Sequence, residues 1–176
     1  VYEVSGSPAV AHITGYSGGG GAITIPTTLG GYPVVAIEDE SFAHQTSLIT
    51  VTIPDGISSI GDRAFVYCTN LVSVTIPQSA SWIFDTPFTG CPSLTAINVE
   101  GGNANYASVD GVLYNAALTV LIECPGGKEG ELIVPESVSL IREQAFEGCS
   151  LTSVILGSNV NEIWNAAFQD CTSLIS

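Results

Sequence analysis

The sequence repeats itself about every 23 residues, and this repeat limits the folds that are open to it. A phenylalanine recurs at an even spacing in Phe42, Phe65 and Phe88, and the same residue returns in Phe146 and Phe168. A unit this short cannot bury its own apolar side, so stacked units must share a core. The period therefore predicts a solenoid. An isoleucine and a leucine recur in the same register, at Ile37, Ile60, Ile83, Ile141 and Ile163, and at Leu48, Leu71, Leu94, Leu151 and Leu174.

Each unit carries the signal of one short strand. In one unit Val74 and Ile76 alternate with Thr75, which is typical of a strand with one buried and one outward side. Pro77 follows at once and ends the strand, because proline has no N–H to donate to a continuing ladder. Stacking then places the strands of successive units in a parallel sheet, about 4.8 Å apart.

The motif L-x-x-V-x-I-P, followed by I, A-F, C and the next L, spans residues 71–94. It resembles the bacterial BspA-like leucine-rich repeat family, and the match covers residues 24–99 and 132–176. The resemblance implies an α/β solenoid, with a short parallel β-sheet and mostly irregular or short-helical return segments. Members are generally surface or secreted proteins that adhere or bind host proteins, so it also implies an extracellular or cell-surface location on a bacterium.

Two regions depart from the repeat. Val1–Val4 and Val10–Thr14 alternate apolar and polar residues around Ser-Gly-Ser-Pro, which predicts a β-hairpin that caps the open end of the solenoid. The second region, 100–131, contains Asp110-Gly111, a pair typical of two-residue hairpin turns. We expect a β-meander there that projects from the stack or lies along it.

The domain prediction follows from these regions. We expect a single leucine-rich repeat domain over residues 1–176, ending in mid-array. Its parts are an N-terminal cap at 1–22, repeats at 23–99, a β-hairpin insertion at 100–131 and repeats at 132–176.

Charge narrows the choice of partners. Three basic residues against seventeen acidic ones give a net charge of −14, which repels nucleic acid and anionic membranes. No apolar run approaches the roughly 18 residues of a membrane span, so we expect no membrane insertion. The acidic surface favours solubility, with a basic partner or weakly bound Ca²⁺ as the alternative.

Four of the five cysteines occupy one repeat position: Cys68, Cys91, Cys149 and Cys171. Metal sites use closely spaced pairs, whereas these cysteines lie a full repeat or more apart in the sequence. Disulfides need facing Cβ atoms, but equivalent residues of stacked coils point the same way. The spacing favours a buried row of free thiols, and disulfides between neighbouring coils are the alternative. Cys124 has no partner by register.

No catalytic, cofactor-binding or metal site emerges from the remaining polar residues, and we expect no enzyme. His12 and His44 fall in no catalytic motif and are interpreted as surface or cap residues. The cluster Glu38–Glu40 is interpreted as a solvated turn, with weak Ca²⁺ binding as the alternative.

The outward side of the predicted sheet is then the candidate binding surface. The outward residue is small and polar in the first four predicted strands, but it is apolar in the last two, where it is Ile133 and Ile155. We expect the insertion to cover these isoleucines; if it does not, they mark a contact site. The predicted concave, protein-binding face comprises Thr24, Thr52, Thr75, Asn98, Ile133 and Ile155.

Three functional hypotheses result. The first is a non-catalytic module for protein binding or adhesion, within a longer bacterial surface or secreted protein. The alternative is a structural spacer or stalk with no ligand of its own. The least favoured is a regulatory domain attached to an enzyme.

Overall fold

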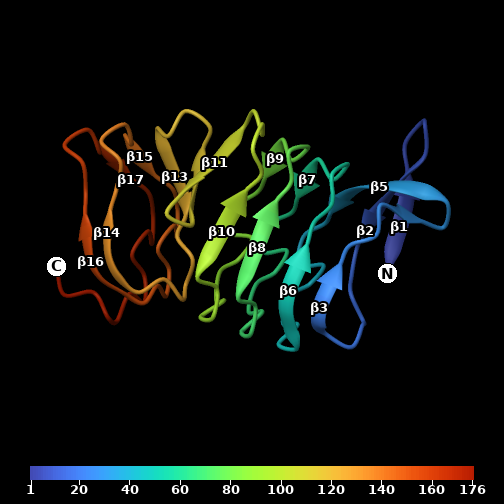
Figure 1. Cartoon of the computed structure of the whole chain (residues 1–176), viewed down its shortest axis with the longest axis horizontal. Helices are drawn as coiled ribbons and strands as arrows, with labels where there is room; N and C mark the ends of the chain where they lie inside the picture. The colour runs from blue at the N-terminus through green and yellow to red at the C-terminus, as the bar shows by residue number, and fades with distance from the viewer.

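The chain winds into a β-solenoid of about seven turns, and the computed structural model describes all 176 residues. The coils succeed one another along the long axis, from the N-terminal end to the C-terminal end (Figure 1). Each coil contributes one strand to a front side, which faces the viewer in Figure 1, and one strand to a back side.

The front side carries the strand that each repeat predicts. Four parallel strands pair in the order β10-β8-β6-β3, and β14 and β16 form a separate parallel pair further along the stack. Their bounds are β3 (Gly21–Thr24), β6 (Leu48–Thr52), β8 (Ser73–Ile76), β10 (Ala96–Val99), β14 (Gly130–Ile133) and β16 (Leu151–Ile155).

The back side is also divided into two sheets. The first has the order β1-β2-β5-β7-β9, with β4 beside β5, and the second has the order β11-β12-β13-β15-β17. The bounds in the first are β1 (Tyr2–Ser5), β2 (Val10–Ile13), β4 (Thr28–Leu29), β5 (Tyr32–Ile37), β7 (Ser59–Ile60) and β9 (Trp82–Ile83). Those in the second are β11 (Tyr106–Val109), β12 (Val112–Asn115), β13 (Val120–Glu123), β15 (Leu140–Ile141) and β17 (Glu162–Ile163).

The N-terminal hairpin and the meander that the sequence predicts are both present. β1 and β2 are antiparallel, and β2 then pairs with β5 in parallel, so the hairpin extends the back sheet by two strands. β11, β12 and β13 form an antiparallel meander, whose last strand pairs in parallel with β15.

The expected helical character is wrong, because the structure has no helix and the return segments are runs of turns. In the first coil, the N–H groups of Ser41 and Ala43 bond three residues back, to Glu38 and Glu40. The N–H group of Phe42, between them, donates instead to Ala64 of the next coil. An α-helix needs every interior N–H for its own i−4 carbonyl, so this alternation excludes one.

Phenylalanine stacking fills the interior of the regular coils. Ring centroids lie 4.9 Å apart for Phe42 and Phe65, 5.5 Å for Phe65 and Phe88, and 4.7 Å for Phe146 and Phe168. Phe42, Phe65, Phe88 and Phe146 are buried. Burying each ring contributes roughly 1.5–3 kcal/mol, so the repeated phenylalanine is a main source of stability.

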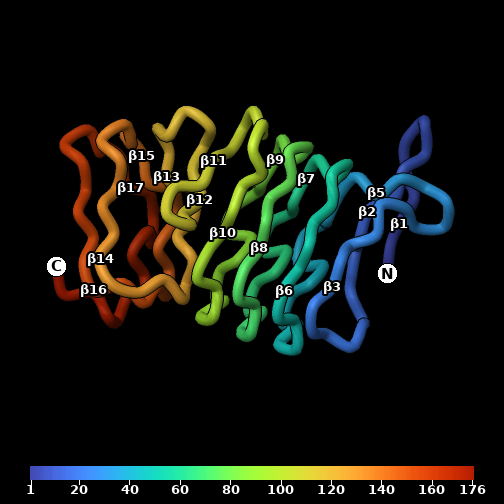
Figure 2. Tube along the Cα trace, in the orientation of Figure 1, coloured from blue at the N-terminus to red at the C-terminus, as the bar shows by residue number.

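The stack of rings is interrupted between Phe88 and Phe146, and the insertion occupies the interruption. β12 is buried on both faces, with Leu113 in a core of 25 residues and Val112 and Tyr114 in a second core of 13 residues. The meander therefore does not project from the stack or lie along its outside, as expected, but takes a place between the coils (Figure 2). There it separates the two cores.

Candidate functional site

Four of the six predicted surface residues form a continuous row across the front sheet. Thr24 pairs with Thr52, Thr52 with Thr75, and Thr75 with Asn98. Their buried neighbours in the sequence, such as Val51 and Val74, face the core, so strand alternation directs the row outward. This part of the front face is built of short polar side chains.

The two isoleucines continue the surface on the second front sheet. Ile133 of β14 lies directly opposite Ile155 of β16, and they are 65% and 46% exposed. The expectation that the insertion covers them is wrong, because the insertion lies inside the stack. Glu131, two residues before Ile133, is also exposed, so strand alternation places a carboxylate on the same face. We call Glu131, Ile133 and Ile155 the isoleucine patch.

The tip of the hairpin formed by β11 and β12 separates the polar row from the isoleucine patch. The Gly111 carbonyl accepts the Ile97 N–H at 2.8 Å, and the Ser108 hydroxyl accepts the Val99 N–H at 3.2 Å. These bonds provide acceptors for two backbone N–H groups on the edge of β10, where no further parallel strand follows. Lys128 Nζ holds the tip through Asp110 Oδ2 at 2.8 Å. The hairpin tip thus covers the open edge of β10, and the front face changes from polar to apolar residues beyond it.

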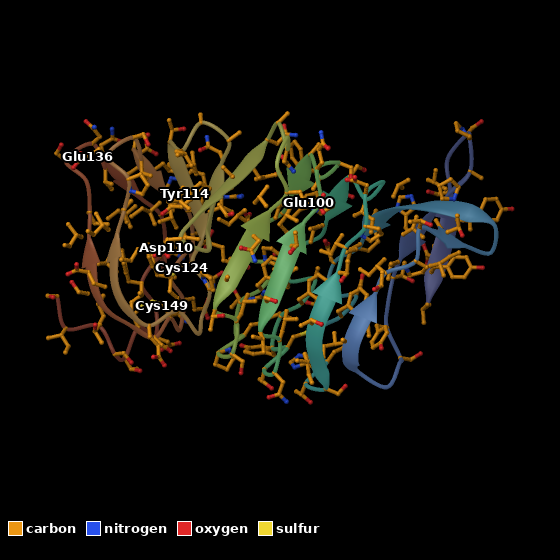
Figure 3. The ribbon with its side chains drawn as sticks, viewed as in Figure 1. Glu100, Asp110, Tyr114, Cys124, Glu136 and Cys149 are labelled. Carbon is orange, nitrogen blue, oxygen red and sulfur yellow. The ribbon has the colours of Figure 1, made fainter.

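Several surface acids support the turns between coils. The Asp39 carboxylate accepts the Asp62 N–H at 2.8 Å, and the Glu100 carboxylate accepts the Gln78 N–H at 3.1 Å. Glu136, labelled with Glu100 in Figure 3, accepts the Ser158 N–H at 3.2 Å. Part of the negative charge is therefore structural, because these carboxylates satisfy backbone donors of a neighbouring coil.

The cysteines of the regular coils are buried free thiols with a shared geometry. Cys68 and Cys91 donate S–H bonds to the Phe42 and Phe65 carbonyls of the preceding coil, at sulfur–oxygen distances of 3.1 and 3.2 Å. Burial raises the pKa of Cys68 to about 11, and the pKa of Cys91 also rises, mainly through burial. Thiols kept protonated in this way are poor nucleophiles and metal ligands.

Near the junction of the two cores, sulfur atoms cluster differently. Cys149 Sγ lies 3.6 Å from Cys171 Sγ, and Cys124, the cysteine with no predicted partner, is a neighbour of Cys149. The neighbouring Cys124 thiol lowers the pKa of Cys149 to about 6. All five cysteines are free, and no three Cys, His, Asp or Glu side chains converge as a metal site.

A buried carboxyl group marks the same junction. Glu123 is 3% exposed, and its Oε1 accepts the Phe88 N–H at 3.1 Å while Oε2 has no partner. Burial raises its pKa to about 8, against a partial opposing effect of Arg142. Tyr114, on β12, is also fully buried with an unpartnered hydroxyl, and burial raises its pKa. The insertion therefore brings two unsatisfied polar groups into the interior.

The N-terminal cap holds a polar cluster that the sequence analysis missed. His12 lies between Ser5 and Glu38, with Nδ1 2.6 Å from Glu38 Oε1 and Nε2 3.0 Å from Ser5 Oγ. The hairpin register, in which Glu3 faces His12, contained the signal, because it places Ser5 on the same face as the imidazole. His44, by contrast, stacks on Tyr67 of the next coil at 5.1 Å.

An aromatic groove lies at the break in the back sheet. It has a volume of about 450 Å³, and its walls include Trp82, Phe84 and Tyr106. Trp82 and Phe84 are 61% and 45% exposed and meet edge to face at 5.9 Å. The Tyr106 hydroxyl accepts the Ile83 N–H at 2.7 Å, which satisfies part of the open edge of β9.

A model of the BspA-type leucine-rich repeat region matches residues 23–116 and 128–176 in six copies. The chain belongs to this family. Within a BspA-type array, the unmatched residues 117–127 contain β13, Glu123 and Cys124. Glu123 and Cys124 thus fall where the family pattern is lost, whereas Tyr114 lies just before that point, within the matched residues.

Solved structures of two leucine-rich repeat proteins and of a vaccine antigen share the fold of this BspA-type chain. A T. pallidum protein is 24% identical, with a TM-score of 0.64, over 99% of this chain and 87% of its own. A Eubacterium ventriosum protein is 20% identical, with a TM-score of 0.59, over 94% of this chain and 66% of its own. The pneumococcal vaccine antigen PcpA is 20% identical, with a TM-score of 0.59, over 99% of this chain and 67% of its own.

Some of these relatives are longer than the BspA-type chain described here. The chain spans about two thirds of the length of the E. ventriosum protein. No curated protein matches the sequence. None of its elements is a helix of the length and apolar character that crossing a membrane requires.

Proposed function

We propose that this chain is a repeat module whose front face binds a protein partner without the use of catalytic groups, within a bacterial surface or secreted protein. The observation that carries the proposal is the isoleucine patch. Two large apolar side chains, 65% and 46% exposed, lie directly opposite each other on the same side of the solenoid as the row of short polar residues. Exposed apolar groups beside polar ones are typical of contact sites between proteins.

The chemistry of the patch indicates the kind of partner. Ile133 and Ile155 offer an apolar contact, and Glu131 beside them offers a carboxylate. The whole chain carries a net charge of −14, which raises the association rate of a basic partner. We therefore expect a protein with an apolar side chain at the centre of its contact surface and Lys or Arg at the rim.

The family and the relatives support the surface location. The matched family is the BspA type, and one solved relative is described as a pneumococcal vaccine antigen. An antigen used in a vaccine is accessible to antibodies, and an accessible repeat protein can meet partners outside the cell. We extend this location to the present chain as part of the proposal, with adhesion as its biological role.

A binding panel tests the proposal. The purified chain is immobilised and exposed to purified extracellular-matrix and host cell-surface proteins, and equilibrium binding is compared at low and at high salt concentration. We expect at least one saturable interaction that weakens at the higher salt concentration, since screening reduces attraction between opposite charges. If no member of the panel binds, the module is better explained as a spacer, which the short polar side chains of the first front sheet favour.

A further inference from the structure

Ser5, His12 and Glu38 form a hydrogen-bonded chain of side chains on the N-terminal cap. His12 Nε2 lies 3.0 Å from Ser5 Oγ, and His12 Nδ1 lies 2.6 Å from Glu38 Oε1. Three separate segments supply them: β1, β2 and the residue after β5. The antiparallel pairing of β1 with β2 and the parallel pairing of β2 with β5 fix their relative positions.

The donors and acceptors assign the proton on His12. Of the two neutral tautomers of His12, only the one with its hydrogen on Nδ1 can donate to a Glu38 carboxylate, which can only accept. In that tautomer Nε2 is an acceptor for the Ser5 hydroxyl. This order of serine, imidazole and carboxylate is the order in which a base activates a serine nucleophile and a third group orients the base.

The cluster borders an open polar pocket of about 420 Å³. Its walls are Glu3, Ser5, His12, Thr14, Glu38 and Asp39, with no apolar side chain among them. Ser5 is exposed, so a dissolved molecule can reach its hydroxyl. The three carboxylates in the walls give the pocket a negative potential, which disfavours anionic substrates.

Backbone donors are also available beside the serine. The N–H groups of Gly6 and Ser7 follow Ser5 directly, and neither donates a hydrogen bond within the chain. In α/β-hydrolases the N–H after the nucleophile helps to stabilise the oxyanion of the tetrahedral intermediate.

We propose that Ser5 is an activated nucleophile that accepts acyl groups from small neutral or cationic esters, with His12 as the base and Glu38 as a positioning residue. The activity is separate from the proposed protein binding, because it uses the back of the cap and not the front face. It is an ester hydrolase reaction in an otherwise non-enzymatic type of fold.

Acyl transfer and hydrolysis use the same three residues in turn. Ser5 Oγ forms a bond to the carbonyl carbon while its proton passes to His12 Nε2. The tetrahedral adduct collapses, the bond from carbon to the leaving oxygen breaks, and the alcohol departs with the proton from His12. Water, deprotonated by His12, then attacks the acyl carbon. Breakage of the Oγ–carbon bond releases the acid, and the proton returns from His12 to restore the serine hydroxyl.

Labelling with a fluorophosphonate tests the nucleophile directly. The full chain is treated with the probe, and the modified residue is located by mass spectrometry of proteolytic peptides. We expect a single label on Ser5, lost in Ser5→Ala and retained in Ser7→Ala, an exposed neighbour that serves as the matched control. Labelling spread over many of the serines, or absent from Ser5, would overturn the proposal.

Kinetics test the roles of the other two residues. In His12→Gln we expect the labelling rate to fall about 10²-fold, the lower end of the usual contribution of a general base. In Glu38→Gln, hydrolysis of 4-nitrophenyl acetate should lose kcat with little change in KM, because Glu38 acts through His12. Because the pocket is negative, 4-nitrophenyl acetate should react faster than the anionic 4-nitrophenyl succinate, which has the same leaving group. Equal labelling rates in wild type and His12→Gln, with both chains folded by circular dichroism, would show that Ser5 is not activated.

Discussion

The Glu123 carboxyl group takes the place of a backbone carbonyl. In the regular coils, a carbonyl of the next coil accepts the N–H of the repeated phenylalanine. The N–H groups of Phe42, Phe65 and Phe146 donate to carbonyls of the next coil, at Ala64, Pro87 and Ala167. Phe88 has no such carbonyl, because the insertion follows it, and donates to Glu123 Oε1 at 3.1 Å. Leaving that N–H unsatisfied in the core would cost about 1–3 kcal/mol, which explains a buried carboxyl group at this position.

The buried carboxyl group makes stability depend on pH. Burial raises the pKa of Glu123 from 4.5 to about 8, so the folded chain holds the proton more tightly than the unfolded chain. The stabilising contribution of the protonated form is complete below pH 4.5, declines as pH rises and is lost once pH passes about 8. Glu123→Gln keeps an oxygen acceptor for Phe88 but cannot ionise.

We therefore expect Glu123→Gln to be more stable than wild type at pH 8 and similar to it near pH 4.5. The difference should widen with pH by up to about 1.4 kcal/mol per unit. Urea titrations at pH 5, 6, 7 and 8 measure it, with the exposed residue Glu129 changed to Gln as the control. A difference that stays constant across this range would show that Glu123 is ionised in the folded chain throughout.

The hairpin of β11 and β12 is the element that turns a regular array into two cores. Asp110 and Gly111 at its tip have φ values of 51° and 74°, the left-handed values that the Asp-Gly pair predicts for a type I′ turn. A Cβ on Gly111 would lie 3.0 Å from Ala96 Cβ and 3.1 Å from Ala96 Cα. Both the backbone conformation and the contact with β10 therefore require glycine.

Gly111→Ala should destabilise the chain by about 2 kcal/mol, from the left-handed conformation and the close contact together. Gly101→Ala is the matched control, because a Cβ there meets nothing within 4 Å and its φ is not in the left-handed region. Thermal unfolding followed by circular dichroism compares the two. Equal melting temperatures for both variants would mean that the contact between the hairpin tip and β10 does not contribute to stability.

The elements could be predicted where a residue pattern alone determines them. Alternation at Val74-Thr75-Ile76 predicts a strand, and Asp110-Gly111 predicts a turn; both are present. The return segments were mispredicted as partly helical because their N–H groups bond to a neighbouring coil, and no local pattern reveals that partner. The burial of the meander was missed for the same reason. The two cores that cover the two faces of β12 are formed by residues of other coils, which the local sequence of β12 does not reveal.

At the scale of the whole molecule, the insertion divides the front face into two surfaces of different chemistry. The outward row was predicted by counting from strand to strand, and the strand pairing aligns its residues from Thr24 to Asn98 and Ile133 with Ile155; their role in binding stays a prediction. The exposure of the isoleucines and the cluster of Ser5, His12 and Glu38 could not be predicted, because both depend on how separate segments lie against one another.

The central claim is that Ile133 and Ile155 of the isoleucine patch contact the protein partner. The dissociation constant of the complex between the chain and that partner tests the claim directly. It is measured for the partner found in the panel, with wild type and with Ile133→Thr/Ile155→Thr. The matched control is Ile49→Thr/Val72→Thr, which removes two apolar side chains, 50% and 42% exposed, outside the row. We predict that Kd rises at least about tenfold for the first variant and stays within about twofold for the control. An unchanged Kd in the patch variant, or an equal loss in both, would contradict this assignment.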